Sequence, residues 1–187
     1  MIASISVPRT GIILDIRFNP GGESSIAYDV VSYFIDEPVK AAMWKSIKYV
    51  PAYRSWGNEP EWEQSDPAIV QPREGTRYLG PLVVLTGPAT YSSAEDFLVP
   101  LSFSGRAVLV GGTTAGSTGN PIYVDLPRDG KFRVVSKRDL FPDGAEFVGY
   151  GITPDVVVEP TQHDLFEERD PVLEAGIEAI TNWVSNR

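Results

Sequence analysis

The sequence predicts an α/β fold with a mostly parallel sheet, an antiparallel hairpin and flanking helices. Short apolar runs at residues 11–17, 82–85 and 107–110 are typical of strands that are buried on both faces. Residues 23–35 and 93–103 lie between these runs and have helical periodicity. Because strands and helices alternate, we expect parallel pairing through right-handed crossovers.

Composition narrows the classes of function. With 187 residues, 42% of them hydrophobic, we expect a single domain over residues 1–187. The formal net charge of −9 argues against a nucleic-acid partner, because phosphate binding needs clustered Lys and Arg. The chain has no Cys, and His163 is its one histidine, which excludes thiolate and His-rich metal sites. No apolar run approaches a membrane-spanning length. We therefore expect no cofactor, no metal and no membrane insertion.

The start of the chain does not resemble a signal peptide. Residues 1–8 lack a charged start followed by a long apolar run. The first buried strand begins at Gly11, almost at once. We therefore expect the chain to begin inside a larger protein and to lack an upstream portion.

The first strand ends in a glycine turn. Gly21 and Gly22 allow positive φ and a close approach by a ligand or another segment. The G-x-G-x-x-G pattern of dinucleotide binding is absent. Farther along, partial alternation predicts an irregular strand at residues 43–50. Residues 55–80 are rich in Pro, Gly, Glu and Trp and predict a surface insertion, either a packed structural one or a lid that faces a substrate.

Residues 86–97 are the most informative stretch. A buried strand is followed by the break at Gly87 and Pro88, and a helix begins near Ser92. This layout lifts a serine hydroxyl out of the core beside backbone N–H groups that can hold an oxyanion. The alternative is a serine that only caps the helix.

The last third of the chain adds a loop, a hairpin and a helix. The glycine-rich loop at residues 111–119 follows a strand, at the edge where open α/β sheets bind ligands. Residues 121–126 and 131–137 predict an antiparallel pair, because Asp-Gly joins them. A last strand is expected at residues 154–158 and a C-terminal helix at residues 170–185.

Four motifs follow one another in a family-specific order. They are D-x-R-x-N-x-G-G at residues 15–22, a serine-to-glutamate segment at 85–95, G-R-A-x-x-V-G at 105–111 with the loop 113–116, and G-I-x-P-D at 151–155. Together they resemble the catalytic core of the S41 serine peptidases, the carboxyl-terminal processing or tail-specific protease family, with the tricorn core as a relative. The resemblance spans nearly the whole chain.

The resemblance implies a ClpP/crotonase-like peptidase core and endopeptidase chemistry. Ser92 would be the nucleophile, because the family's reactive serine lies three residues before the glutamate, and Ser93 is the adjacent alternative. The backbone amides of Ser93, Gly21 and Gly22 would form the oxyanion hole. The substrate would be an unstructured peptide or a protein C-terminal region, bound as an added strand.

The match departs from the family at the general base. In the Ser-Lys branch a lysine stands where this chain has Ser117. The tricorn-like branch instead uses a histidine from upstream sequence and an acidic residue late in the domain. Glu146 is the candidate for this acid. The alternative is that Glu146 is an ordinary glutamate in a solvent-exposed turn. Lys137 would serve only with a strongly lowered pKa, and we expect a surface ion pair there. His163 we expect in an exposed loop. The resemblance thus favours the tricorn-like branch, in a chain that is inactive alone.

Two other functions stay open. A non-catalytic ligand- or peptide-binding domain on the same fold would explain the missing base. Acyl-CoA chemistry on a crotonase-like fold is disfavoured by the acidic charge balance. The oligomeric state is open, a homo-oligomer included, and the resemblance suggests a bacterial periplasmic or other extracytoplasmic location.

Overall fold

The centre of the fold is a four-stranded parallel sheet. The computed structural model describes residues 11–185. The strands β1 (Ile12–Asp15), β6 (Leu82–Thr86), β7 (Val108–Gly111) and β11 (Val156–Val157) lie side by side in that order. The parallel sheet expected from the apolar runs is confirmed. All residues of β6 are buried, because the strand has a neighbour on either side and a helical layer on either face.

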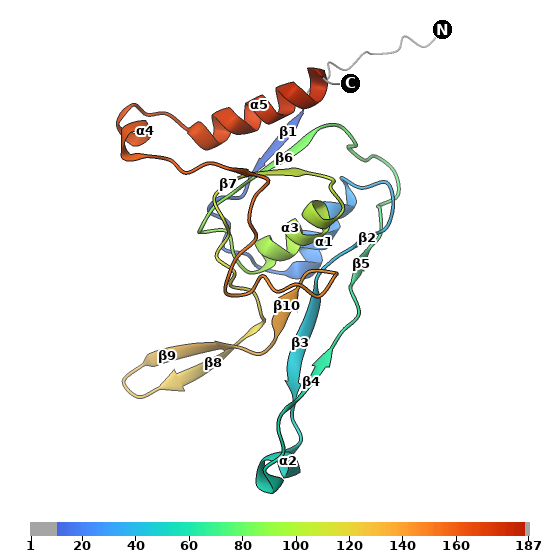
Figure 1. Cartoon of the computed structure of the whole chain (residues 1–187), viewed down its shortest axis with the longest axis vertical. Helices are drawn as coiled ribbons and strands as arrows, with labels where there is room; N and C mark the ends of the chain where they lie inside the picture. Colours follow the sequence, from blue (N-terminus) through green and yellow to red (C-terminus); the bar gives the residue numbers. More distant parts are fainter. Residues whose placement is uncertain (1–10, 186–187) are drawn as a thin grey trace.

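Helices cover both faces of this sheet (Figure 1). On one face, α1 (Ser24–Ser32) and α3 (Ser93–Phe103) pack against each other. On the other face lies α5 (Pro171–Ser185). Successive side chains of β6 point to opposite faces. Leu82 and Val84 therefore join the core under α1 and α3, while Val83 and Leu85 join the core under α5.

A narrow antiparallel arm extends away from the parallel sheet (Figure 1). Its strands are β10 (Arg138–Leu140), β3 (Met43–Lys48) and β4 (Glu61–Gln64), in that order, with α2 (Pro51–Trp56) between β3 and β4 along the chain. Two short strands, β2 (Val39–Lys40) and β5 (Ile69–Val70), pair beside the body. Residues 55–80 therefore contribute two strands, β4 and β5, to these antiparallel ladders.

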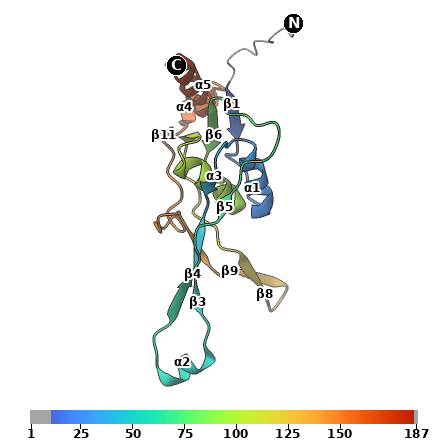
Figure 2. The same cartoon turned by 90° about the vertical axis from the view of Figure 1, so that its right-hand side faces the viewer.

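The expected hairpin is present. β8 (Pro121–Leu126) and β9 (Gly130–Val135) pair over their full length, and the turn between them carries positive φ at Arg128 and Asp129. The hairpin projects from the body as a separate two-stranded ribbon (Figures 1 and 2). The short helix α4 (Gln162–Phe166) precedes α5.

Residues 1–8, which do not resemble a signal peptide, lie outside the described residues. Across residues 11–185, no helix is both long enough and apolar enough to cross a membrane. Nor does this part of the chain hold a cluster of three His, Cys, Asp or Glu side chains suited to a metal ion.

Candidate active site

Ser92 occupies a strained position at the carboxyl end of the central strand β6. It is the N-cap residue of α3, with φ of 61° and ψ of −134°. Residues other than glycine rarely adopt this combination of backbone angles. Its side chain makes no capping hydrogen bond to the helix. Ser92 thus has the N-cap position that the alternative interpretation expects, but its side chain does not act as a cap. Ser92 is one of the residues that line a cleft of about 390 Å³.

The glycine turn touches the Ser92 segment directly. Gly21 has φ of 87°, and a Cβ placed on it would lie 2.5 Å from Ser92 Cβ and 2.7 Å from Ser93 N. The close approach expected of these glycines is confirmed, and the approaching segment is the start of α3. The Gly21 amide donates to Asn19 Oδ1 at 2.9 Å and so already has an acceptor in this structure. The amides of Gly22 and Ser93 are the remaining candidate donors beside the hydroxyl.

Glu95 fixes the loop that follows β7 against the start of α3. Its side chain is fully buried. One carboxylate oxygen accepts hydrogen bonds from the Thr114 hydroxyl at 2.5 Å and the Gly116 amide at 2.7 Å. The other accepts from the Ser117 amide at 2.9 Å and the Thr118 hydroxyl at 2.7 Å. Sequence reasoning used Glu95 only as a marker for the serine, since its partners lie more than a dozen residues away.

Ser117 lies beside Ser92, as its place in the family motif predicts. Its carbonyl accepts a hydrogen bond from the Ser92 amide at 3.1 Å, and both residues line the cleft. A serine hydroxyl is no base at neutral pH. The residue that the resemblance assigns to the lysine position is therefore next to the nucleophile candidate and is no proton acceptor.

The three other candidate bases or acids do not line this cleft. Glu146 bonds Lys45 and lies 3.7 Å from Arg138, and the Lys45 ammonium lowers the pKa of its carboxyl. Lys137 donates to Asp139 at 2.6 Å, an ion pair as expected. His163 is exposed, although it lies in helix α4 rather than in a loop.

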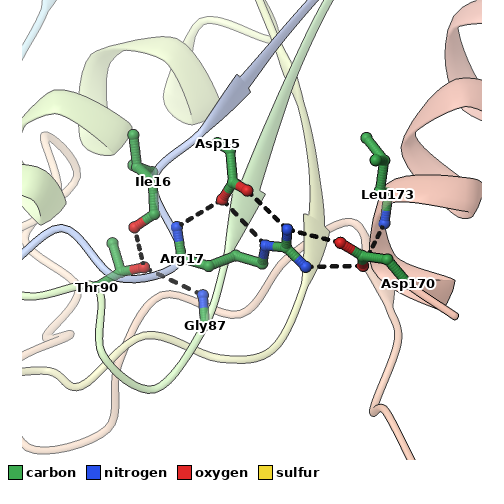
Figure 3. A network of polar contacts seen from close by, with 7 residues as sticks. All are labelled: Asp15, Ile16, Arg17, Gly87, Thr90, Asp170 and Leu173. Carbon is green, nitrogen blue, oxygen red and sulfur yellow. Dashed lines mark hydrogen bonds and ion pairs between the residues drawn. The ribbon is translucent and has the colours of Figure 1, made fainter. Parts of the chain in front are cut away.

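A polar network fixes the end of β1, a few residues before the glycine turn (Figure 3). Arg17, just after β1, donates to Asp15 and to Asp170 at the start of α5, with both nitrogen-to-oxygen distances to Asp170 at 2.8 Å. Buried Thr90 donates to the Ile16 carbonyl at 2.8 Å and accepts from the Gly87 amide at 3.1 Å. Thr90 thus ties the end of β1 to the Ser92 segment. Its role was missed, because a threonine in a turn gives no signal of long-range partners.

Two buried carboxylates lie behind the start of α3. Asp96 accepts from the Ser24 hydroxyl at 2.6 Å, and burial raises its pKa to about 6. Burial also raises the pKa of Asp139, against the effect of Lys137. One oxygen of each carboxylate, Oδ1 of Asp96 and Oδ2 of Asp139, is buried without a hydrogen-bond partner among residues 11–185.

An apolar hollow of about 500 Å³ also borders the glycine turn. Gly21 and Gly22 line both this hollow and the Ser92 cleft. Ile16, Ile26 and Phe97 are among the apolar residues that line the hollow, and Ser93 lines it as well. The glycine turn thus borders both a polar cleft and an apolar hollow.

The fold and these contacts define a class of protein: an α/β protein with a ClpP/crotonase-like peptidase core that holds a serine against a glycine turn. The model of peptidase family S41 matches residues 2–158. The chain belongs to this family.

Known relatives agree with this assignment. The carboxyl-terminal-processing protease of Picosynechococcus is 28% identical over 172 residues, which cover 90% of this chain and 37% of that protein. The carboxy-terminal-processing protease of Bartonella bacilliformis is 24% identical over 164 residues, 87% of this chain and 34% of that protein. The chain thus spans about a third of the length of these relatives.

Solved structures match over nearly the whole chain. The crystal structure of a peptidase from Parabacteroides merdae has a TM-score of 0.76 at 26% identity, with 91% of this chain and 51% of that one covered. Mature CPAF shares the fold with a TM-score of 0.73 at 21% identity, and the match covers 92% of this chain and 44% of CPAF. The tricorn protease shares it with a TM-score of 0.57 at 20% identity, and the match covers 91% of this chain and 15% of the tricorn protease.

Proposed function

We propose that this chain is the C-terminal part of the catalytic core of a serine-type endopeptidase, with Ser92 as the nucleophile. The observation that carries the proposal is the backbone of Ser92. A residue held at φ of 61° and ψ of −134°, without a capping bond from its hydroxyl, is under a strain that a purely structural serine has no reason to bear.

The proposed reaction is acyl transfer to Ser92. The hydroxyl oxygen attacks the scissile carbonyl carbon, and its proton passes to a general base. The amides of Gly22 and Ser93 stabilise the negative oxygen of the tetrahedral intermediate, a contribution of about 3 kcal/mol for each donor. The base then gives its proton to the leaving amine, and water hydrolyses the ester to release the acid and free Ser92.

The base is the missing part. No His, Lys, Asp or Glu side chain is among the described residues that line the cleft with Ser92, so the cleft lacks the groups that most often act as general bases. We therefore propose that the base is supplied by residues beyond the described ones, as in the tricorn-like branch. The chain of 187 residues is then inactive on its own.

The substrate in this proposal is an extended peptide, such as the C-terminal region of an unfolded protein. It lies between the glycine turn and the β8–β9 hairpin, and its main chain pairs with the edges that border the cleft. An apolar side chain next to the scissile bond would enter the hollow formed by Ile16, Ile26 and Phe97. The names of the curated relatives, which are carboxyl-terminal-processing proteases, support this substrate class.

A fluorophosphonate probe tests the nucleophile. In the longest form that the gene encodes, we expect labelling that is lost in Ser92→Ala and kept in Ser93→Ala. The short chain should label weakly or not at all. Labelling that survives Ser92→Ala, or no labelling of the longest form, would overturn the proposal.

The second candidate is a non-catalytic peptide-binding domain on the same fold. Ser117, which the resemblance assigns to the lysine position of the Ser-Lys branch, favours this alternative. No described side chain in the cleft would then activate Ser92. Peptide binding by the longest form without any labelling would support this alternative.

A further inference from the structure

One side chain gives the Ser92 cleft its charge. Among the described residues, Arg133 is the single Lys, Arg, Asp or Glu that lines this cleft. The others are small, amide, hydroxyl, proline or aromatic residues, together with Val135. In a chain with a formal net charge of −9, the cleft at the candidate nucleophile is therefore locally positive.

The hairpin register explains why Arg133 faces the cleft. Arg133 of β9 lies opposite Tyr123 of β8, and both line the cleft. The next pair on the same face is Lys131 opposite Asp125, one step nearer the tip and outside the cleft lining. The cation at 133 thus faces the site with a tyrosine beside it, whereas the cation at 131 faces an aspartate.

The base of the hairpin is tied to the loop that contacts Ser92. The amides of Ser136 and Lys137 both donate to the Gly119 carbonyl, at 3.0 and 3.3 Å. The Ser136 hydroxyl donates to the Asn120 carbonyl at 2.7 Å. Two residues before Gly119, the Ser117 carbonyl accepts from the Ser92 amide. Arg133, three residues before Ser136, therefore has a defined position relative to the candidate nucleophile.

Arg133 has no carboxylate partner of its own within residues 11–185. The described arginines that do form ion pairs are Arg17, Arg138 and Arg169. A guanidinium binds a carboxylate through two parallel hydrogen bonds, and such charge-assisted bonds are stronger than neutral ones. A guanidinium without a carboxylate partner, in the cleft that Ser92 also lines, is thus suited to a carboxylate that arrives with a ligand.

We propose that Arg133 binds a carboxylate of the peptide in the Ser92 cleft and so favours substrates that present a carboxylate there. The carboxylate comes either from an Asp or Glu side chain near the scissile bond or from the C-terminus of the peptide. The inference rests on the proposed function, because it places a peptide in the same cleft.

Binding to the Ser92→Ala protein tests this without turnover. The probes are fluorescein-labelled nonapeptides of Ala, Ser and Leu with Glu or Gln at the centre, each with a free or an amidated C-terminus. We expect fluorescence anisotropy to show about tenfold tighter binding of one carboxylate form than of its neutral counterpart. The Glu–Gln pair reports a side-chain carboxylate, and the acid–amide pair reports the C-terminus.

Two variants assign the effect to Arg133. Arg133→Gln in the Ser92→Ala protein should weaken the carboxylate peptides about tenfold and leave the neutral ones within twofold. Lys131→Gln removes the same charge from the same hairpin face and should leave all the peptides within twofold. Arg133→Lys should recover part of the affinity, because one ammonium replaces the two-pronged contact.

Three results would overturn the proposal. They are equal binding of the charged and neutral peptides, an equal loss in Lys131→Gln, and no binding of any peptide at concentrations up to the millimolar range. None of them affects fluorophosphonate labelling of Ser92, which tests the proposed function separately.

Discussion

The buried carboxylate of Glu95 accepts a hydrogen bond from the backbone amide of Ser117 at 2.9 Å. The Ser117 carbonyl in turn accepts from the amide of Ser92, three residues before Glu95. This closed circuit holds the loop after β7 against the first turn of α3. It also fixes the residue that stands at the family's lysine position beside the candidate nucleophile.

Replacement of Glu95 by Gln should loosen this loop. The NH2 group that replaces one carboxylate oxygen in Gln cannot accept a hydrogen bond, so either the Ser117 or the Gly116 amide loses its acceptor inside the protein. We expect the free energy of unfolding to fall by about 1–3 kcal/mol. Urea denaturation measures this loss, and hydrogen exchange should show faster exchange of the Gly116 and Ser117 amides.

Glu178→Gln is the matched control, because the same change is made at an exposed position of α5. It should alter the free energy of unfolding by no more than about 0.5 kcal/mol. Equal stability of the two variants would contradict the role given to Glu95.

The strain at Ser92 predicts that Ser92→Gly stabilises the protein. Glycine adopts φ of 61° with ψ of −134° without the steric cost borne by a side chain, a cost of order 1–3 kcal/mol. Part of this gain is offset by the greater flexibility of glycine in the unfolded chain. We expect Ser92→Gly to be about 1 kcal/mol more stable than Ser92→Ala, which keeps the Cβ. Thermal unfolding compares the two, and a lower melting temperature for the glycine variant would show that the site is unstrained.

Thr90→Val should loosen the tie between the end of β1 and the Ser92 segment. Valine keeps the shape of the side chain but leaves the Gly87 amide without its acceptor (Figure 3). It also removes one of two donors to the Ile16 carbonyl, which still accepts from the Asn19 amide. We expect a loss of about 1–3 kcal/mol in the free energy of unfolding, because Thr90 is fully buried.

Thr90→Ser keeps the hydroxyl and serves as the control for this change. It should keep most of the stability, with a loss of about 1 kcal/mol for the deleted methyl group. If Thr90→Val loses no more than Thr90→Ser, the hydrogen bonds of the hydroxyl contribute little and the role given to Thr90 is wrong.

The sequence predicts well those structural elements whose formation depends mainly on a local sequence pattern. The run of residues 82–85 predicts a central strand because every side chain is apolar, and the Asp-Gly turn predicts the hairpin because it allows positive φ. The close approach of Gly21 to another segment was also predictable, since a glycine turn has few other uses.

The polar interior was not predictable in the same way. Glu95 and Asp96 look like ordinary acidic residues in the first turn of a helix, yet both are buried. Their environment depends on partners from distant parts of the chain, such as Thr114 and Ser24. Likewise, β3 pairs with β10, more than ninety residues away, and no local pattern marks this pairing.

The raised pKa of Asp96 predicts how stability depends on pH. Its pKa is about 6 in the folded protein and near 3.8 in the unfolded chain, so the folded state binds the proton more tightly. The free energy of unfolding should therefore fall as pH rises from about 4 to about 6 and stay lower above that range. The difference between the two pKa values corresponds to roughly 3 kcal/mol, since one pKa unit is about 1.4 kcal/mol.

Asp96→Asn removes this titration, because asparagine is neutral throughout and can still accept from the Ser24 hydroxyl. Its melting temperature should exceed that of the unmodified protein at pH 7.5 and match it at pH 4.5. Some decline with pH should remain, since burial raises the pKa of Asp139 as well. Asp29→Asn, at an exposed position of α1, should keep the full pH dependence. If the Asp96→Asn protein declined between pH 4.5 and 7.5 as steeply as the unmodified one, burial of the Asp96 carboxylate would not be what makes this fold sensitive to pH.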